Sequence, residues 1–321
     1  MEGPSPVKLT LIAGAIAALL IGASLWLWTP DLMREPLEAA YLRSKADLIE
    51  VDGVQLHLRD DGPRTAPAVI MLHGLGASLH TWEAWAQALA PQFRVIRFDL
   101  PGSGLSPPDP ALDYTDERSL HLILALMDHL GLQRATQVGN SMGGRLAWLF
   151  AAQHPARVDK LVLVSPDGFA SPGFAYDTLA DVPALLGFMR YVLPRAMLRA
   201  NLAPAYADPN KLTDAVVDRY YDLMRAPGAR DALLQRMRQT LLHDPVPRLR
   251  TITAPTLLLW GTGDAMIPPA NANDYLEAIP GSKLVRLEGL GHLPQEETPQ
   301  TSHPRWRTQA TDPRVEQHDS D

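Results

Sequence analysis

Short apolar runs alternate with amphipathic segments along most of this chain, and no other feature constrains its fold more strongly. The apolar runs have the length of strands buried on both faces, and they occupy residues 68–72, 93–98, 135–139, 160–165, 256–261 and 283–288. Helical periodicity lies between them, at residues 80–90, 116–130 and 145–154. Strands that alternate with helices predict an α/β fold, with a mostly parallel sheet covered by helices on both faces.

Two segments depart from this alternation. Residues 47–51 and 54–59 alternate apolar and polar side chains around Asp52-Gly53, which predicts a β-hairpin. Residues 168–248 carry no strand pattern, and prolines divide them into helical pieces at 184–202, 211–225 and 230–242. We therefore expect a helical cap at about 168–248, inserted over the carboxyl edge of the sheet.

The N-terminal region is apolar and uncharged from Leu9 to Trp28. A helix of this length would span about 30 Å, the thickness of the hydrocarbon core of a bilayer. A cleaved signal peptide is the alternative, but the run exceeds the usual apolar core of such a peptide, and no small-residue cleavage site follows it. The sequence therefore predicts an N-terminal transmembrane helix, with a membrane anchor at 1–29, a linker at 30–45 and a membrane localisation.

Charge and cysteine content exclude several functions. The chain has 29 Lys and Arg against 36 Asp and Glu, a net charge of −7, and no long basic run. Nucleic acid is therefore not an expected partner. Because the chain has no cysteine, a disulfide framework, a Cys-ligated zinc ion and a thiol nucleophile are all excluded.

The motif Gly139-Asn140-Ser141-Met142-Gly143 lies between a predicted buried strand and a predicted helix. In this context G-x-S-x-G forms a sharp turn that presents the serine hydroxyl as a nucleophile. The turn brings backbone segments so close together that side chains at the glycine positions would collide with them. We predict Ser141 as the nucleophile and the backbone N–H of Met142 as one donor to the oxyanion.

A serine nucleophile needs a base and an acid, and the chain order Ser, Asp, His places both downstream. His292 follows the last predicted strand by a glycine-containing loop, and Asp264 follows the strand at 256–261. Asp167 also follows a strand and is the alternative acid. The second oxyanion donor is expected in the loop after the first buried strand, where the backbone N–H of Leu75 is the candidate. This chemistry implies no metal ion and no cofactor.

Together these segments resemble the α/β-hydrolase family. The matching segments are residues 73–78, 98–106, 139–144, 260–268 and 289–297, so the resemblance covers about 46–297. It implies an α/β-hydrolase fold and a serine hydrolase, similar to bacterial membrane-anchored esterases and lipases. The N-terminal run is similar to bacterial signal anchors, which favours a catalytic domain on the periplasmic or outer side. Haloalkane dehalogenases and epoxide hydrolases of this fold use an Asp nucleophile, where this chain has Ser141.

The predicted cap indicates the class of substrate. Its apolar side chains are expected to pack in the core and, in part, to line the pocket: Leu185, Leu186, Phe188, Met189, Tyr191, Val192, Met197 and Leu198. We therefore expect a small-molecule carboxylic ester with an apolar acyl group. Arg190, Arg195 and Arg199 could bind an acidic substrate, but their spacing equally suits a solvated helix face, which is the favoured interpretation.

Other activities stay open. Residues 139–144 are also similar to the C–C bond hydrolases of aromatic degradation, which would use the same three residues, as would a perhydrolase. Those C–C hydrolases typically carry Trp directly after the catalytic His, and here Leu293 follows His292. A non-catalytic ligand-binding protein of the same fold is the alternative from another class.

The C-terminal segment differs from the rest of the chain. Residues 301–321 contain few apolar side chains and are interrupted by Pro304 and Pro313. Such a segment cannot bury an apolar face. We therefore expect the hydrolase domain to occupy 46–300 and residues 301–321 to form a disordered tail.

Overall fold

The computed structural model describes residues 11, 14–16, 19, 22, 27–170, 175–300 and 302. Within them the strands are β1 (Leu48–Val51), β2 (Val54–Asp61), β3 (Ala68–Leu72), β4 (Arg94–Phe98), β5 (Ala135–Asn140), β6 (Val158–Val164), β7 (Thr256–Gly261) and β8 (Lys283–Leu287). They form one eight-stranded sheet in the order β1-β2-β4-β3-β5-β6-β7-β8. The pairs from β4 to β8 are parallel, and β2 pairs antiparallel with β1 and β4. The predicted α/β fold with a mostly parallel sheet is confirmed.

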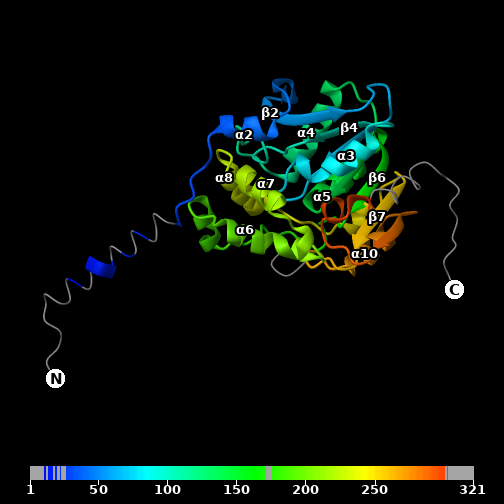
Figure 1. Ribbon diagram of the computed structural model, residues 1–321. Helices are drawn as coiled ribbons and strands as arrows, with labels where there is room; N and C mark the ends of the chain where they lie inside the picture. The colour runs from blue at the N-terminus through cyan, green and yellow to red at the C-terminus, as the bar shows by residue number, and fades with distance from the viewer. Residues whose placement is uncertain are drawn as a thin grey trace.

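Helices cover the sheet and its carboxyl edge (Figure 1). The α-helices are α2 (Arg34–Tyr41), α3 (Glu83–Leu89), α4 (Asp116–His129), α5 (Met142–Gln153), α6 (Arg195–Leu202), α7 (Asp214–Met224), α8 (Ala229–Gln239), α9 (Val246–Leu249), α10 (Asn271–Ala278) and α11 (Pro294–Glu297). Successive residues of β3 point to opposite faces. Val69 and Met71 pack with Trp85 of α3, whereas Ile70 and Leu72 belong to the core that contains α4 and α5.

The predicted hairpin is confirmed. Strands β1 and β2 pair in register from Val51 opposite Val54. Asp52 has φ 50° and Gly53 has φ 73°. Two consecutive positive φ angles are what a two-residue type I′ turn requires, and they match the right-handed twist of the strands.

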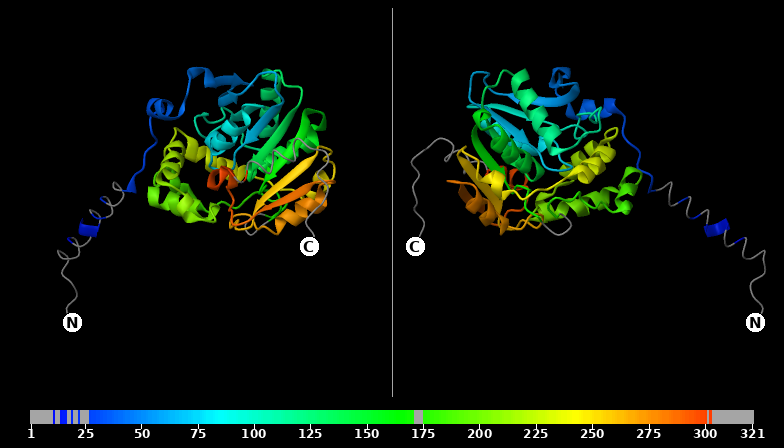
Figure 2. Two further views of the ribbon diagram at one scale, coloured as in Figure 1. Left: turned by 45° about the vertical axis from the view of Figure 1, so that its right-hand side comes forward. Right: turned by 180° about the vertical axis from the view of Figure 1, so that it is seen from behind.

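Between β6 and β7 the described residues form several helices, the short 3-10 helix η4 (Ala184–Arg190), α6, α7 and α8 among them, joined by turns and isolated β-bridges. Pro194 separates η4 from α6, so the predicted piece at 184–202 is two elements. In Figure 2 the green and yellow cap helices lie to one side of the sheet. The expected core packing of the apolar residues of 184–202 is largely wrong, because Leu185 is 76% exposed and Phe188 is 63% exposed.

The predicted linker at 30–45 contains α2, which packs against the cap. Leu37 is 2% exposed and belongs to an apolar cluster with Leu105 and Leu223. The Tyr41 hydroxyl donates to Asp222 Oδ2 of α7 at 2.8 Å. Arg59 of β2 donates to the Tyr41 carbonyl at 3.0 Å, so α2 connects the cap to the sheet.

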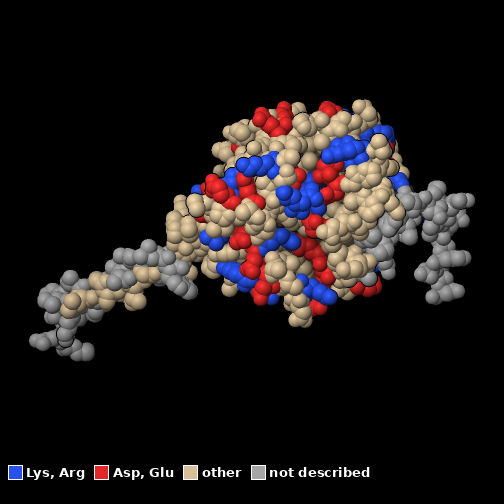
Figure 3. Space-filling model, turned by 45° about the horizontal axis from the view of Figure 1, so that its top comes forward, with Lys and Arg blue, Asp and Glu red and all other residues tan. Residues whose placement is uncertain are grey.

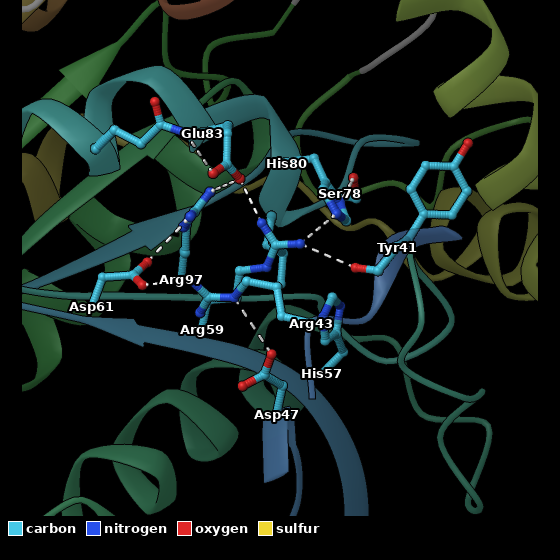
Figure 4. A network of polar contacts seen from close by, with 12 residues as sticks. Tyr41, Arg43, Asp47, His57, Arg59, Asp61, Ser78, His80, Glu83 and Arg97 are labelled. Carbon is cyan, nitrogen blue, oxygen red and sulfur yellow. Dashed lines mark hydrogen bonds and ion pairs between the residues drawn. The ribbon is translucent and has the colours of Figure 1, made fainter. Parts of the chain in front are cut away.

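A network of charged side chains fixes the sheet end of this connection (Figure 4). Arg59 and Arg97 both donate to Glu83 Oε2, at 2.6 Å and 2.7 Å, and Arg97 also contacts Asp61. Burial alone would raise the pKa of Glu83, but the hydrogen bond from Arg97 and the charges of Arg97 and Arg59 outweigh it and lower this pKa to about 2. Glu83 is therefore a carboxylate over the whole neutral and mildly acidic range.

The surface mixes charges of both signs. On the face shown in Figure 3, acidic and basic side chains are interleaved. That face therefore offers no extended patch of one sign to a charged polymer.

The predicted transmembrane helix is wrong as judged by the described residues. None of their helices is long and apolar enough to span a membrane. The longest, α4, has 14 residues, or about 21 Å of helix, and a bilayer core needs about 30 Å. Most of residues 9–28, where we expected this helix, lie outside the described residues. The same finding corrects three related expectations: the membrane anchor, the membrane as a partner, and the membrane localisation with the catalytic domain on the periplasmic or outer side.

The expected disordered tail at 301–321 also lies outside the described residues, apart from Ser302. The Ser302 hydroxyl oxygen accepts a hydrogen bond from Trp85 Nε1 of α3 at 3.1 Å. The described chain thus stays in contact with the domain up to this residue.

Candidate active site

Ser141 occupies the sharp turn between β5 and α5. Its backbone is left-handed, with φ 54° and ψ −124°, a conformation that costs a non-glycine residue about 1–3 kcal/mol. The flanking glycines are sterically required. A Cβ on Gly139 would lie 2.1 Å from the Gly143 carbonyl oxygen, and one on Gly143 would lie 2.2 Å from the Leu72 carbonyl oxygen. The turn therefore needs glycine at both positions, as the sequence predicts.

His292 and Asp264 meet beyond the ends of β8 and β7. His292 Nδ1 lies 2.8 Å from Asp264 Oδ2, and both side chains are buried. Asp264 Oδ1 accepts hydrogen bonds from the backbone N–H of Met266 at 2.8 Å and of Ile267 at 2.9 Å. Burial opposes the charge of Asp264, but contact with His292 and these two donors lowers its pKa below the ordinary value.

Four of the five predicted site residues line one cavity of about 280 Å³, and the fifth contacts one of these four. Ser141, His292, Leu75 and Met142 are among its lining residues, and Asp264 lies behind His292. The walls are mostly apolar, and the cap contributes Asn201, Leu202, Ala205, Tyr220, Met237 and Thr240. These cap residues are different from the ones that the sequence singled out. The tertiary packing of the cap over the sheet decides which residues line the cavity, and helical periodicity in the sequence does not reveal that packing.

Asn140 is a further site residue that the sequence analysis missed. Its Nδ2 donates to the carbonyl oxygens of Val164, at 3.1 Å, and of His292, at 3.0 Å. The side chain therefore ties the loop of His292 to the strands beside Ser141. The only available signal was its place before the serine in the motif.

His73 holds the loop that carries Leu75. The backbone N–H of Leu100 donates to His73 Nε2 at 3.1 Å, so the ring proton lies on Nδ1, which is 2.8 Å from the Gly74 carbonyl oxygen. Burial lowers the pKa of His73, and the ring stays neutral. Because the peptide is trans, fixing the Gly74 carbonyl also fixes the Leu75 N–H, which points to the opposite side.

Asp167, the alternative acid, pairs with a different residue. Its Oδ2 lies 3.6 Å from Arg145 Nε, and Arg145 Nη1 lies 3.3 Å from Asp116 Oδ2. Burial disfavours the charge of Arg145, but these two carboxylates outweigh it and raise its pKa. The carboxylate that contacts His292 is the one on Asp264.

The cap arginines are engaged on the surface. Arg195 Nε lies 2.5 Å from Asp218 Oδ1, and Arg199 Nη1 lies 3.0 Å from Asp214 Oδ1. Arg190 Nε lies 2.5 Å from Asp231. These pairs agree with the favoured interpretation of a solvated, charged helix face. Among the described residues, no group of three or more His, Cys, Asp or Glu side chains could hold a metal ion.

The fold and the geometry of this site define a class, the hydrolases of the α/β fold. The sequence profile of the family described as alpha/beta hydrolase fold matches residues 67–299. The chain belongs to this family and is a hydrolase.

Individual relatives are similar over most of the chain. A 2-hydroxy-6-oxononadienedioate/2-hydroxy-6-oxononatrienedioate hydrolase of Comamonas testosteroni is 32% identical over 252 residues, covering 75% of this chain and 86% of that protein. A 2-hydroxy-6-oxo-6-phenylhexa-2,4-dienoate hydrolase of the same organism is 32% identical over 239 residues, covering 71% and 82%. The crystal structure of the enol-lactonase from Burkholderia xenovorans LB400 superposes with a TM-score of 0.70 at 26% identity, covering 83% of this chain and 100% of that one.

Proposed function

We propose that this hydrolase cleaves a bond at a carbonyl carbon, with Ser141 as nucleophile, His292 as general base and Asp264 as the acid that orients the base. The observation that carries the proposal is the 2.8 Å contact between His292 Nδ1 and buried Asp264, beside a cavity that Ser141 and His292 share. A carboxylate at this position keeps the proton on Nδ1 and leaves Nε2 free to accept one.

The proposed reaction proceeds through an acyl-enzyme. His292 takes the hydroxyl proton while Ser141 attacks the carbonyl carbon, and the backbone N–H groups of Met142 and Leu75 donate to the oxyanion. Met142 is the first residue of α5, where backbone N–H groups have no acceptor within the helix. The leaving group takes the proton from His292, and water then hydrolyses the acyl-enzyme.

For the bond that is cleaved, we propose C–C bond hydrolysis of an oxo-dienoic acid as the first activity to test. The names of the two relatives at 32% identity support it. The test is turnover of 2-hydroxy-6-oxo-6-phenylhexa-2,4-dienoate, followed by the loss of its absorbance, with Ser141→Ala as the control. If the unaltered protein reacts with a fluorophosphonate at Ser141 but leaves this acid intact, C–C hydrolysis is refuted.

Hydrolysis of a neutral carboxylic ester with an apolar acyl group is the second candidate. Two observations favour it: the mostly apolar cavity wall and Leu293 in the position after His292. A series of nitrophenyl esters from acetyl to hexanoyl tests it. A rate that rises with chain length supports an apolar acyl site, and a flat or falling series contradicts it.

A further inference from the structure

We propose that Glu296 is a positioning residue, which holds His292 in place by fixing the cap segment to which the His292 backbone is hydrogen-bonded. This inference rests on the proposed role of His292 as the base. Glu296 lies four residues after His292, in α11, and its side chain is 5% exposed. Glu296 is not among the residues that line the cavity, and we propose no contact between its carboxylate and substrate.

Three cap side chains donate to this one carboxylate. Glu296 Oε2 accepts from the Tyr206 hydroxyl at 3.0 Å and from Arg219 Nη2 at 2.8 Å. Glu296 Oε1 accepts from the Tyr220 hydroxyl at 2.9 Å. Arg219 and Tyr220 belong to α7, whereas Tyr206 directly follows the short 3-10 helix η5 (Ala203–Ala205). Glu296 therefore joins two separate elements of the cap to the loop of His292.

The connection returns to His292 through the backbone. The Ala205 carbonyl, next to Tyr206 in the chain, accepts from the His292 N–H at 2.8 Å and from the Leu293 N–H at 3.2 Å. Glu297 makes a second connection between the same two segments, because its carboxylate accepts from the backbone N–H of Gly291 at 2.6 Å and of Asp208 at 2.8 Å. Displacement of Tyr206 would move Ala205 and, with it, the acceptor of the His292 N–H.

The charge of Glu296 is part of the connection. Burial would raise the pKa of Glu296, but the charge of Arg219 and the hydroxyl donors outweigh it and lower this pKa. The ionised carboxylate also serves as the counter-charge of Arg219, which is 20% exposed. Networks of this kind hold a catalytic group rigidly only when every member is satisfied.

The test compares two tyrosines that each donate to one carboxylate, Tyr206 to Glu296 of α11 and Tyr41 to Asp222 of α7. Tyr206→Phe removes one donor to Glu296. Tyr41→Phe removes the 2.8 Å hydrogen bond to Asp222, on α7 but away from the loop of His292, and is the matched control. For each variant, the measurements are the rate of fluorophosphonate labelling at Ser141, kcat and KM on an ester that the unaltered protein hydrolyses, and the melting temperature.

We expect Tyr206→Phe to lower kcat and the labelling rate together by about 10-fold, with KM changed less than about 2-fold, because displacing a catalytic group by 1 Å can cost about 100-fold in rate. Tyr41→Phe should keep both rates within about 2-fold. Glu296→Gln should have a larger effect, of about 10- to 100-fold. A purely structural role would instead lower the melting temperature of both tyrosine variants and leave their rates unchanged.

Glu296→Gln leaves Arg219 without its counter-charge and can unfold the protein for that reason alone. The double variant Glu296→Gln/Arg219→Gln removes both charges, so its rates can be measured in a folded protein. Folded variants that label Ser141 and turn over substrate at the rate of the unaltered protein would overturn the inference. If the unaltered protein itself fails to label, the proposed function fails, and this inference fails with it.

Discussion

Replacing Asp264 by Asn tests the proposed site most directly, because the structure determines how the new amide must lie. Asp264 Oδ1 accepts hydrogen bonds from the backbone N–H of Met266 and Ile267. The carbonyl oxygen of an Asn side chain can take over both, whereas its NH₂ group cannot. The NH₂ group must therefore face His292 Nδ1, in the position that Asp264 Oδ2 occupies at 2.8 Å.

This orientation reverses the tautomer of His292. Nδ1 becomes the acceptor, so the ring proton moves to Nε2, which can then no longer take the proton of Ser141. In serine proteases the same exchange lowers kcat by about 10⁴-fold, or about 5.4 kcal/mol of transition-state stabilisation. We expect a loss of this size for Asp264→Asn, with the shape of the side chain and both backbone contacts kept.

The assay is steady-state turnover of whichever substrate the unaltered protein accepts, together with fluorophosphonate labelling of Ser141. Asp177→Asn is the matched control, because Asp177 Oδ1 lies 2.6 Å from His243 Nδ1 in an exposed pair. A kcat of Asp264→Asn within about 10-fold of the unaltered protein would refute the reasoning. A loss of about 10⁴-fold in Asp167→Asn instead would assign the acid to the alternative residue.

Three further changes test other parts of the structure. The folded pKa of Glu83, about 2, lies below its ordinary value of 4.5, so the ionised group stabilises the fold above pH 4.5 and loses this effect as the pH falls through about 2. Glu83→Gln should therefore destabilise the protein more at about pH 7 than at about pH 2.5 in urea unfolding, and equal penalties would contradict this. Gly74→Ala places a Cβ 3.2 Å from Ser141 Cβ and should slow labelling about 10-fold at a similar melting temperature; an unchanged rate would mean that the loop moves aside. Leu37→Ala should cost about 2–5 kcal/mol of unfolding free energy, and a cost under about 0.5 kcal/mol would mean that residues 30–45 are only a linker.

The sequence predicts the sheet well because each central strand is short and buried on both faces. The predicted strands at 68–72 and 256–261 coincide with β3 and β7. The glycines of the serine turn are also predictable, because the surrounding backbone leaves no room for a Cβ atom at either position. Turn chemistry is equally local, since Asp52-Gly53 determines the hairpin by its own backbone angles. Features that depend on neighbours in sequence are therefore predictable from sequence.

The contacts that support the site are not local, and the sequence does not reveal them. Tyr206 and Glu296 are separated by 90 residues along the chain, and nothing in either segment identifies the other as a partner. The same holds for Leu37, because residues 30–45 are mixed and polar, and only contact with the cap makes α2 part of the domain. The apolar residues of η4 show the opposite error. Their helical spacing predicts that they pack in the core, but none of the residues of η4 is buried.

The charged side chains beside the cavity would affect the binding of an acidic substrate and of a neutral substrate differently. Arg145 is a charged residue of the cavity wall, but its guanidinium already lies between the carboxylates of Asp116 and Asp167. A substrate carboxylate at this wall would compete with two fixed carboxylates for one cation, and it would have to approach Asp167 to do so. A neutral ester would meet no such competition and would need only the apolar part of the wall. The names of the two relatives support the proposal of an acidic substrate, and the paired charges at this wall support the proposal of a neutral one, so rates measured on both substrates decide between the two proposals.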